Sequence, residues 1–284
     1  MSNRVYSSTK RDQTVNKHSN REFTKSDCIK WLDTLEDESV NLWILDPPYN
    51  VLTGNMTNKN GAAVFHSRYT AKVSPSESDL EKGIVTPRFE VAIPWEEKQK
   101  LDDYKETCYK WYCKAHQKLC DDSFMFIFWS MRYLYLAYQI FDVNRVIFWQ
   151  QPNMISSISG DFCYDITPII VVRKGNPRLT KEAGLWDKSS ILNFTKPQKK
   201  KKKDKLCHPT QKPQALLEHL VWLSDADHEG NVIGDFFAGS GSLLRAVNKA
   251  DVILCDQNRE YYDKFFDINV ADPRVHICKI KDEG

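Results

Sequence analysis

The segment Asp46-Pro47-Pro48-Tyr49-Asn50 combines a carboxylate, a proline carbonyl and an aromatic ring directly after an apolar run. Residues 41–45 are predicted to form a buried strand, because the run is short, apolar and rich in β-favouring residues, and two prolines end it. In open α/β folds, ligands bind at the carboxyl ends of the strands. Two acceptors and a stacking ring at such an edge suit a flat base that carries an exocyclic amino group. Asp-Pro-Pro also occurs in ordinary turns, so this segment does not decide the function alone.

A second segment, residues 231–247, combines a short strand, a glycine-rich turn and the expected start of a helix. Gly239 and Gly241 would let a ligand approach the backbone closely. A dinucleotide fingerprint needs a third glycine where this chain has Leu244, which argues against a nicotinamide or flavin cofactor. The next predicted strand ends in Asp256, and an acid at that place usually binds the ribose hydroxyls. We therefore predict a nucleoside cofactor without a pyrophosphate.

The chain resembles the β-class S-adenosylmethionine-dependent DNA amino-methyltransferases in three blocks. These are Asp46-Pro-Pro-Tyr-Asn50, His208-Pro-Thr-Gln-Lys-Pro213 and Asp235-Phe-Phe-Ala-Gly-Ser-Gly-Ser242. The catalytic block precedes the glycine block, as in this class, and the likeness spans roughly residues 26–266. The resemblance implies a three-layer, Rossmann-like α/β methyltransferase fold with a mostly parallel sheet and a circularly permuted motif order. It also implies S-adenosylmethionine as cofactor and double-stranded DNA as substrate, with the target base flipped out.

The resemblance assigns residue roles as well. The catalytic residues are Asp46, Pro47, Pro48 and Tyr49: the acid and the first proline carbonyl accept the amino hydrogens, and Tyr49 stacks on the base. The implied cofactor-binding residues are Asp27, Cys28, His208, Thr210, Gln211, Lys212, Asp235, Phe237, Ala238, Gly239, Ser240, Gly241, Ser242 and Asp256. Asp27 suits a helix cap equally well, so both roles stay open. For Phe236 we expect core packing.

Within this class, aspartate at position 46 goes more often with N6-adenine and serine with N4-cytosine, so the resemblance favours adenine. N4-cytosine, RNA and a catalytically silent nucleic-acid-binding protein of the same fold stay open as alternatives. Recognition in this class usually lies just before the His208 block, here about residues 175–206. The candidate DNA-binding residues are Arg173, Lys174, Arg178, Lys181, Lys199, Lys200 and Lys201. The lysine run also fits a solvated loop or a nuclear signal.

Composition restricts the protein class only loosely. Forty basic and 38 acidic residues give a net charge of +2, so overall charge does not argue for a nucleic-acid partner. No stretch approaches the roughly 20 apolar residues of a membrane span, and the N-terminus is too polar for a signal peptide. The eight cysteines contain no Cys-x-x-Cys pair, so we expect no metal and a reduced, intracellular protein, cytoplasmic, nucleoid-associated or nuclear. A homodimer and a separate restriction or accessory chain stay open as partners.

The elements that must position these residues follow from apolar periodicity. Residues 1–25 are expected to form a basic flexible tail and residues 26–284 a methyltransferase domain, with a lid or insertion at 51–94 and a recognition insertion at about 175–206. Helices are predicted at 27–35, 104–119, 132–141 and 214–226, and further strands at 124–129, 143–149, 166–172 and 252–256. Strands that alternate with helices favour a mostly parallel sheet between two helical layers.

Overall fold

The computed structural model describes residues 19–49, 101–152, 165–197, 211–239 and 241–258. The chain divides into two units, one formed by Met1–Pro47 and Lys105–Gly284 and the other by Pro48–Tyr104. In the second unit, the Tyr104 hydroxyl donates to the Pro48 carbonyl at 2.9 Å. The sheet described next belongs to the first unit.

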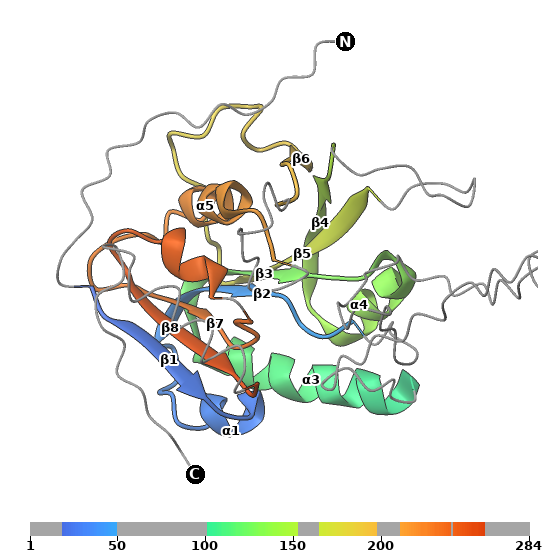
Figure 1. The fold of residues 1–284 in the computed structure, drawn as a ribbon, viewed down its shortest axis with the longest axis vertical. Helices are drawn as coiled ribbons and strands as arrows, with labels where there is room; N and C mark the ends of the chain where they lie inside the picture. The colour runs from blue at the N-terminus through green and yellow to red at the C-terminus, as the bar shows by residue number, and fades with distance from the viewer. Residues whose placement is uncertain (1–18, 50–100, 153–164, 198–210, 240, 259–284) are drawn as a thin grey trace, which may run out of the picture. The chain divides into compact units, whose positions relative to one another are not determined.

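An eight-stranded sheet forms the first unit, in the order β1-β8-β7-β2-β3-β5-β4-β6 (Figure 1). The strands are β1 Arg21–Lys25, β2 Val40–Leu45, β3 Leu119–Phe128, β4 Val143–Gln150, β5 Ile166–Lys174, β6 Ile191–Asn193, β7 Val232–Asp235 and β8 Asp251–Asp256. Each neighbouring pair from β1 to β3 is parallel. Strand β5 is antiparallel to both β3 and β4, and β6 is parallel to β4. The predicted mostly parallel sheet is confirmed.

Helices cover both faces of this sheet. They are α1 Cys28–Leu32, α3 Leu101–Lys118, α4 Leu134–Ile140 and α5 Gln214–Leu223, with the 3₁₀ turns η1 Met131–Tyr133 and η2 Ser242–Arg245. Figure 1 shows α1 and α3 on one face and α5 on the other, which confirms the three layers. The buried side of α3 repeats at helical spacing, with Cys108, Trp111, Tyr112 and Ala115 almost fully covered.

The side-chain alternation of β2 decides which way Asp46 faces. Trp43 donates from its indole nitrogen to the Ala115 carbonyl of α3 at 3.0 Å, and its ring packs edge-on against Trp31 of α1. Successive side chains of a strand point to opposite faces. Ile44 and, one residue past the strand, Asp46 therefore face the side that α5 covers.

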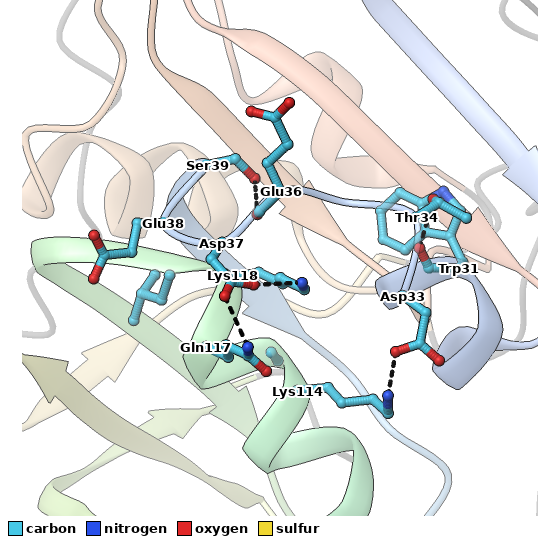
Figure 2. A network of polar contacts seen from close by, with 12 residues as sticks. Trp31, Asp33, Thr34, Glu36, Asp37, Glu38, Ser39, Lys114, Gln117 and Lys118 are labelled. Carbon is cyan, nitrogen blue, oxygen red and sulfur yellow. Dashed lines mark hydrogen bonds and ion pairs between the residues drawn. The ribbon is translucent and has the colours of Figure 1, made fainter.

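Polar contacts hold the start of β2 against the end of α3 (Figure 2). The carboxylate of Asp37 accepts from Lys118 at 2.6 Å and from Gln117 at 2.8 Å, and Lys114 pairs with Asp33. Lys118 is buried, so its ammonium depends on this carboxylate for the interactions it has lost with water. These contacts connect the segment between α1 and β2 to the end of α3.

Residues 21–25, which the sequence assigned to a flexible tail, instead form strand β1. The side chain of Arg21 is buried and donates to the carbonyls of Ala250 and Val247 at 2.7 and 3.1 Å. The strand also pairs with β8 along its whole length. The tail prediction is therefore wrong for these residues, because pairing with a strand more than 220 residues away leaves no local pattern.

Two further elements differ from the prediction. The helix expected from residue 243 is only the 3₁₀ turn η2, because the amides of Asn248, Lys249 and Ala250 donate to the Asp227 carboxylate and divert the chain. Strand β6 was not predicted, since three residues are too few for a periodic pattern. The lid predicted at residues 51–94 lies outside the described residues.

Gly234 leaves room for the buried ring of Trp43 on the neighbouring strand. A Cβ at position 234 would lie 2.2 Å from Cζ3 of Trp43, and the bond to Ala115 holds that ring. We therefore expect Gly234→Ala to destabilise the fold by about 1–3 kcal/mol through overpacking. Gly184→Ala is the control, because its Cβ would come no closer than 3.4 Å to a neighbour. Thermal unfolding of both variants is the measurement, and Gly234→Ala should melt at the lower temperature. Equal melting temperatures for the two variants would contradict the packing account.

Candidate active site

Three neighbouring parallel strands end in acids at the same edge of the sheet. Asp256 ends β8, Asp235 ends β7 and Asp46 follows β2. From β7 the chain continues to β8 on one side, whereas from β2 it continues to β3 on the other side. The crevice at such a reversal of strand order is where open α/β sheets bind ligands. The segment that begins at Asp46 and the glycine-rich segment with Asp235 and Asp256, which the sequence predicted to be functional, therefore meet at one ligand-binding edge.

A buried lysine pairs with Asp46 at this edge. The ammonium of Lys212 donates to Oδ2 of Asp46, and the two side chains are 9% and 23% exposed. The same ammonium lies 4.9 Å from the centre of the Phe128 ring at the end of β3, which is a cation–π contact. The sequence did not predict the ion pair between Lys212 and Asp46.

The acids at this edge influence one another. Burial, followed by the carboxylates of Asp46 and Asp256, raises the pKa of Asp235 well above its usual range. The Phe237 amide, which donates to Asp235 at 2.8 Å, and the ammonium of Lys212 act in the opposite direction. An edge with this charge distribution favours a cationic ligand.

The glycine turn is bonded to the end of β8. Gly239 and Gly241 have positive φ angles of 47° and 67°, where a side chain would strain the backbone. The amide of Gly239 donates to Oδ2 of Asp256 at 2.8 Å, and the amide of Ala238 donates to the carbonyl of Cys255 at 3.0 Å. Burial raises the pKa of Asp256, although this amide bond opposes the rise. The turn thus presents bare backbone beside a carboxylate, an arrangement that fits a nucleoside.

The two phenylalanines after Asp235 differ in burial. Phe236 is 1% exposed and packs edge-on against Trp43 and Trp111, with ring centres 5.2 and 5.7 Å apart. This confirms the prediction that Phe236 belongs to the core. Phe237 is half-buried, and the centre of its ring lies 5.4 Å from that of Trp111. Its contact with a cofactor stays a prediction.

Asp27 caps the helix that follows it. Its carboxylate accepts from the amides of Ile29 and Lys30 at 3.0 and 3.2 Å, which confirms the capping role. Burial and the neighbouring Asp27 raise the pKa of Cys28 to about 12, so this thiol is neutral at physiological pH. The amide of Ser26 donates to the Asp256 carbonyl at 3.2 Å, which places this segment beside the end of β8. Cofactor contacts of Asp27 and Cys28 stay predictions.

The DNA-binding candidates divide into separate groups. Arg173 and Lys174 end β5, whose antiparallel direction places them at the edge opposite Asp46. Lys174 donates to the Leu119 carbonyl at 2.7 Å. Arg178 and Lys181 are exposed in the loop after β5.

The remaining candidates are distributed as follows. Gln211 and Ser242 are half-buried next to Lys212 and Gly241, and Pro48 and Tyr49 belong to the second unit. His208, Thr210, Ser240, Lys199, Lys200 and Lys201 lie outside the described residues. Within the described ranges, no three His, Cys, Asp or Glu side chains could hold a metal ion, and none of the helices is long and apolar enough to cross a membrane.

A family model described as N6_N4_Mtase, DNA methylase, matches residues 40–267, which include all three sequence blocks. The chain belongs to this family of DNA methylases. Type II methyltransferase M2.DpnII of Streptococcus pneumoniae is 26% identical to this methylase over 231 residues, which cover 76% of each chain. The crystal structure of the M1.HpyAVI-SAM complex is similar with a TM-score of 0.57 at 18% identity, covering 87% of the methylase and 98% of that chain. The structure of the PvuII DNA methyltransferase (cytosine-N4-specific) is similar with a TM-score of 0.57 at 14% identity, covering 89% of each chain. These similarities confirm the predicted methyltransferase fold.

The raised pKa of Asp235 predicts a pH-dependent cost in stability. A carboxyl whose folded-state pKa lies above its unfolded value stabilises the fold at low pH, and this contribution is lost as pH rises through the folded pKa. Asp235→Asn keeps the acceptor for the Phe237 amide and removes the charge. We expect the variant to melt a few degrees above the wild type at pH 8, at about 2–4 °C per kcal/mol, with a smaller difference at pH 4. The exposed Asp121→Asn is the control, and a difference independent of pH would contradict the assignment.

Proposed function

We propose that this methylase moves a methyl group from S-adenosylmethionine to the N6 amino group of an adenine flipped out of double-stranded DNA. The observation that supports the proposal is the meeting of Asp46 with the glycine turn and Asp235 on neighbouring strands. A catalytic acid and a nucleoside site on adjacent strand ends can bring a base and a methyl donor into contact. A base inside a duplex cannot reach this edge, so it must first leave the stack.

The residues at the ends of β7 and β8 fit the cofactor. Asp256 would bind the ribose hydroxyls, while the backbone at Gly239 and Gly241 allows close approach. Asp235, whose neighbours favour a cation, would face the positively charged end of the ligand. When bound, S-adenosylmethionine supplies an electrophilic methyl group on its sulfonium sulfur.

The protein's part in the reaction is to orient the amino group. The exocyclic nitrogen is a poor nucleophile, because its lone pair is delocalised into the ring. Asp46 would accept one amino hydrogen and the Pro47 carbonyl the other, which favours a more tetrahedral nitrogen with its lone pair directed at the methyl group. As the nitrogen gains the methyl group it must lose a proton, and the Asp46 carboxylate can accept it and pass it to solvent. Tyr49 would stack on the base.

Adenine is the proposed base because aspartate at position 46 goes more often with N6-adenine among the proteins that this chain resembles. N4-cytosine is the second candidate, and the structural similarity to the cytosine-N4-specific PvuII enzyme supports it. The two bases present the same kind of amino group, so the chemistry at Asp46 would not change.

The loop after β5 supports the proposed contact with DNA. Arg178 and Lys181 are exposed there, and Leu185 and Trp186 are 81% and 74% exposed. Exposed apolar side chains beside basic ones are typical of contact surfaces. The carbonyl of Asp187 is bonded to the His219 ring of α5 at 3.1 Å, and the Thr180 amide to the Leu223 carbonyl at 3.0 Å, so the loop is held on a rigid element.

Methyl transfer from labelled S-adenosylmethionine to unmethylated mixed-sequence DNA, followed by nucleoside mass spectrometry, tests the proposal. The wild type is expected to produce N6-methyladenine. Asp46→Ala should lower the rate by about 100-fold or more, the usual contribution of a positioned acid or base, while the protein still binds the cofactor. Asp256→Ala should weaken cofactor binding about tenfold, the equivalent of one lost hydrogen bond of 1.4 kcal/mol.

Three results would overturn parts of this proposal separately. N4-methylcytosine as the product would keep the mechanism and change the base. An Asp46→Ala enzyme with the wild-type rate would remove the chemical role of this acid. Label in RNA alone would change the substrate class.

A further inference from the structure

One ammonium and two carboxylates act on Asp235 at the site. Lys212 donates to Asp46, and it lowers the pKa of Asp235, which Asp46 and Asp256 raise. The four groups come from the ends of β8, β7 and β2 and from the residue two positions before α5. Lys212 therefore neutralises charge at both Asp46 and Asp235.

The Lys212 side chain is held in one place. The next residue, Pro213, is the N-cap of α5, and its ring limits the backbone. The ammonium lies over the Phe128 ring, and the whole residue is 8% exposed. A buried ammonium that left its carboxylate would lose several kcal/mol, because water does not replace the contact. The contact with Asp46 is thus a fixed feature of the site.

A fixed ammonium can orient a catalytic carboxylate. A carboxylate can accept about four hydrogen bonds, so the bond from Lys212 to Oδ2 of Asp46 is compatible with acceptance of an amino hydrogen. Catalytic groups need their productive orientation within about 10–20°, and neighbouring residues usually supply this restraint. Asp46 lies one residue beyond the end of β2, where the sheet ladder no longer holds the backbone.

We propose, on the basis of the function inferred above, that Lys212 is a positioning residue for methyl transfer, whose ammonium fixes the Asp46 carboxylate toward the amino group of the target base. Lys212 acts through Asp46 and does not exchange protons with the base. The two competing roles are a contact to the cofactor, which the sequence resemblance implied, and an ion pair that serves stability alone.

Lys212→Met and Lys212→Arg separate these roles, with Lys118→Met as the matched control. Lys118 is also 8% exposed and also pairs with a carboxylate, that of Asp37, but at the opposite edge. We expect Lys212→Met to lower kcat about 100-fold, comparable with the loss of one preorganised electrostatic partner. The KM for DNA should stay within about threefold, which falls inside 1 kcal/mol. The Kd for S-adenosylmethionine should not rise, because the lost ammonium opposes a cationic ligand at this edge. Lys212→Arg should restore part of kcat, and Lys118→Met should leave kcat unchanged.

Carbon-13 NMR of labelled aspartates in the cofactor-free protein reports on the pair directly, without turnover. The Asp46 carboxyl accepts the hydrogen bond from Lys212, so its signal should shift in Lys212→Met and return toward the wild-type position in Lys212→Arg. The Asp46 signal is assigned as the one that disappears in Asp46→Asn.

Each contrary outcome identifies a different error. An unchanged kcat with weaker cofactor binding in Lys212→Met would assign the lysine to the cofactor. A lower kcat with an unmoved Asp46 carboxyl signal and no rescue by arginine would reduce the pair to a structural contact. A wild-type enzyme that methylates no DNA would overturn the proposed function instead, and the NMR comparison would still decide whether Lys212 fixes the Asp46 carboxylate.

Discussion

Three carboxylates are forced together at one edge of the sheet, and the buried ammonium of Lys212 offsets part of their repulsion. The crowding follows from the parallel pairing of β8, β7 and β2, since neighbouring strands lie only about 4.7–4.9 Å apart. Burial and the neighbouring carboxylates raise the pKa of Asp235, so its ionisation at neutral pH costs stability. A cationic cofactor would relieve the same repulsion. The charges at this edge therefore cost stability and favour the proposed ligand, a common exchange of stability for function.

The edge keeps its geometry because aromatic packing holds β2 against α3. Near the edge, Trp43 and Phe236 pack with Trp111 of α3, and Gly234 leaves the space that the Trp43 ring occupies. Lys212 pairs with a carboxylate at this edge, whereas Lys118, which is equally buried, pairs with the exposed Asp37 at the opposite edge. Lys118 therefore serves as the internal control for Lys212.

Local sequence patterns predicted the sheet, its layers and the edge that carries the site. Prolines end an apolar strand and glycines permit a tight turn, so these residues mark where the strands end. Long-range pairings left no such pattern. Strand β1 is polar at every position except Phe23, and it pairs with β8 at the edge of the sheet. The antiparallel direction of β5, which places Arg173 and Lys174 at the far edge, is not encoded in apolar periodicity. Lys212 was predicted as a cofactor residue from its block, whereas its contact with Asp46 depends on how α5 meets β2.

A crystal structure of the methylase with DNA and an unreactive analogue of S-adenosylmethionine tests the central claim most directly. The account predicts a flipped-out base whose exocyclic nitrogen lies within about 2.6–3.2 Å of an Asp46 oxygen. The same nitrogen should lie about 3–3.5 Å from the position of the methyl group, with the ribose on Asp256. A nucleoside bound away from the ends of β7 and β8, or a base whose amino group points away from Asp46, would contradict the account.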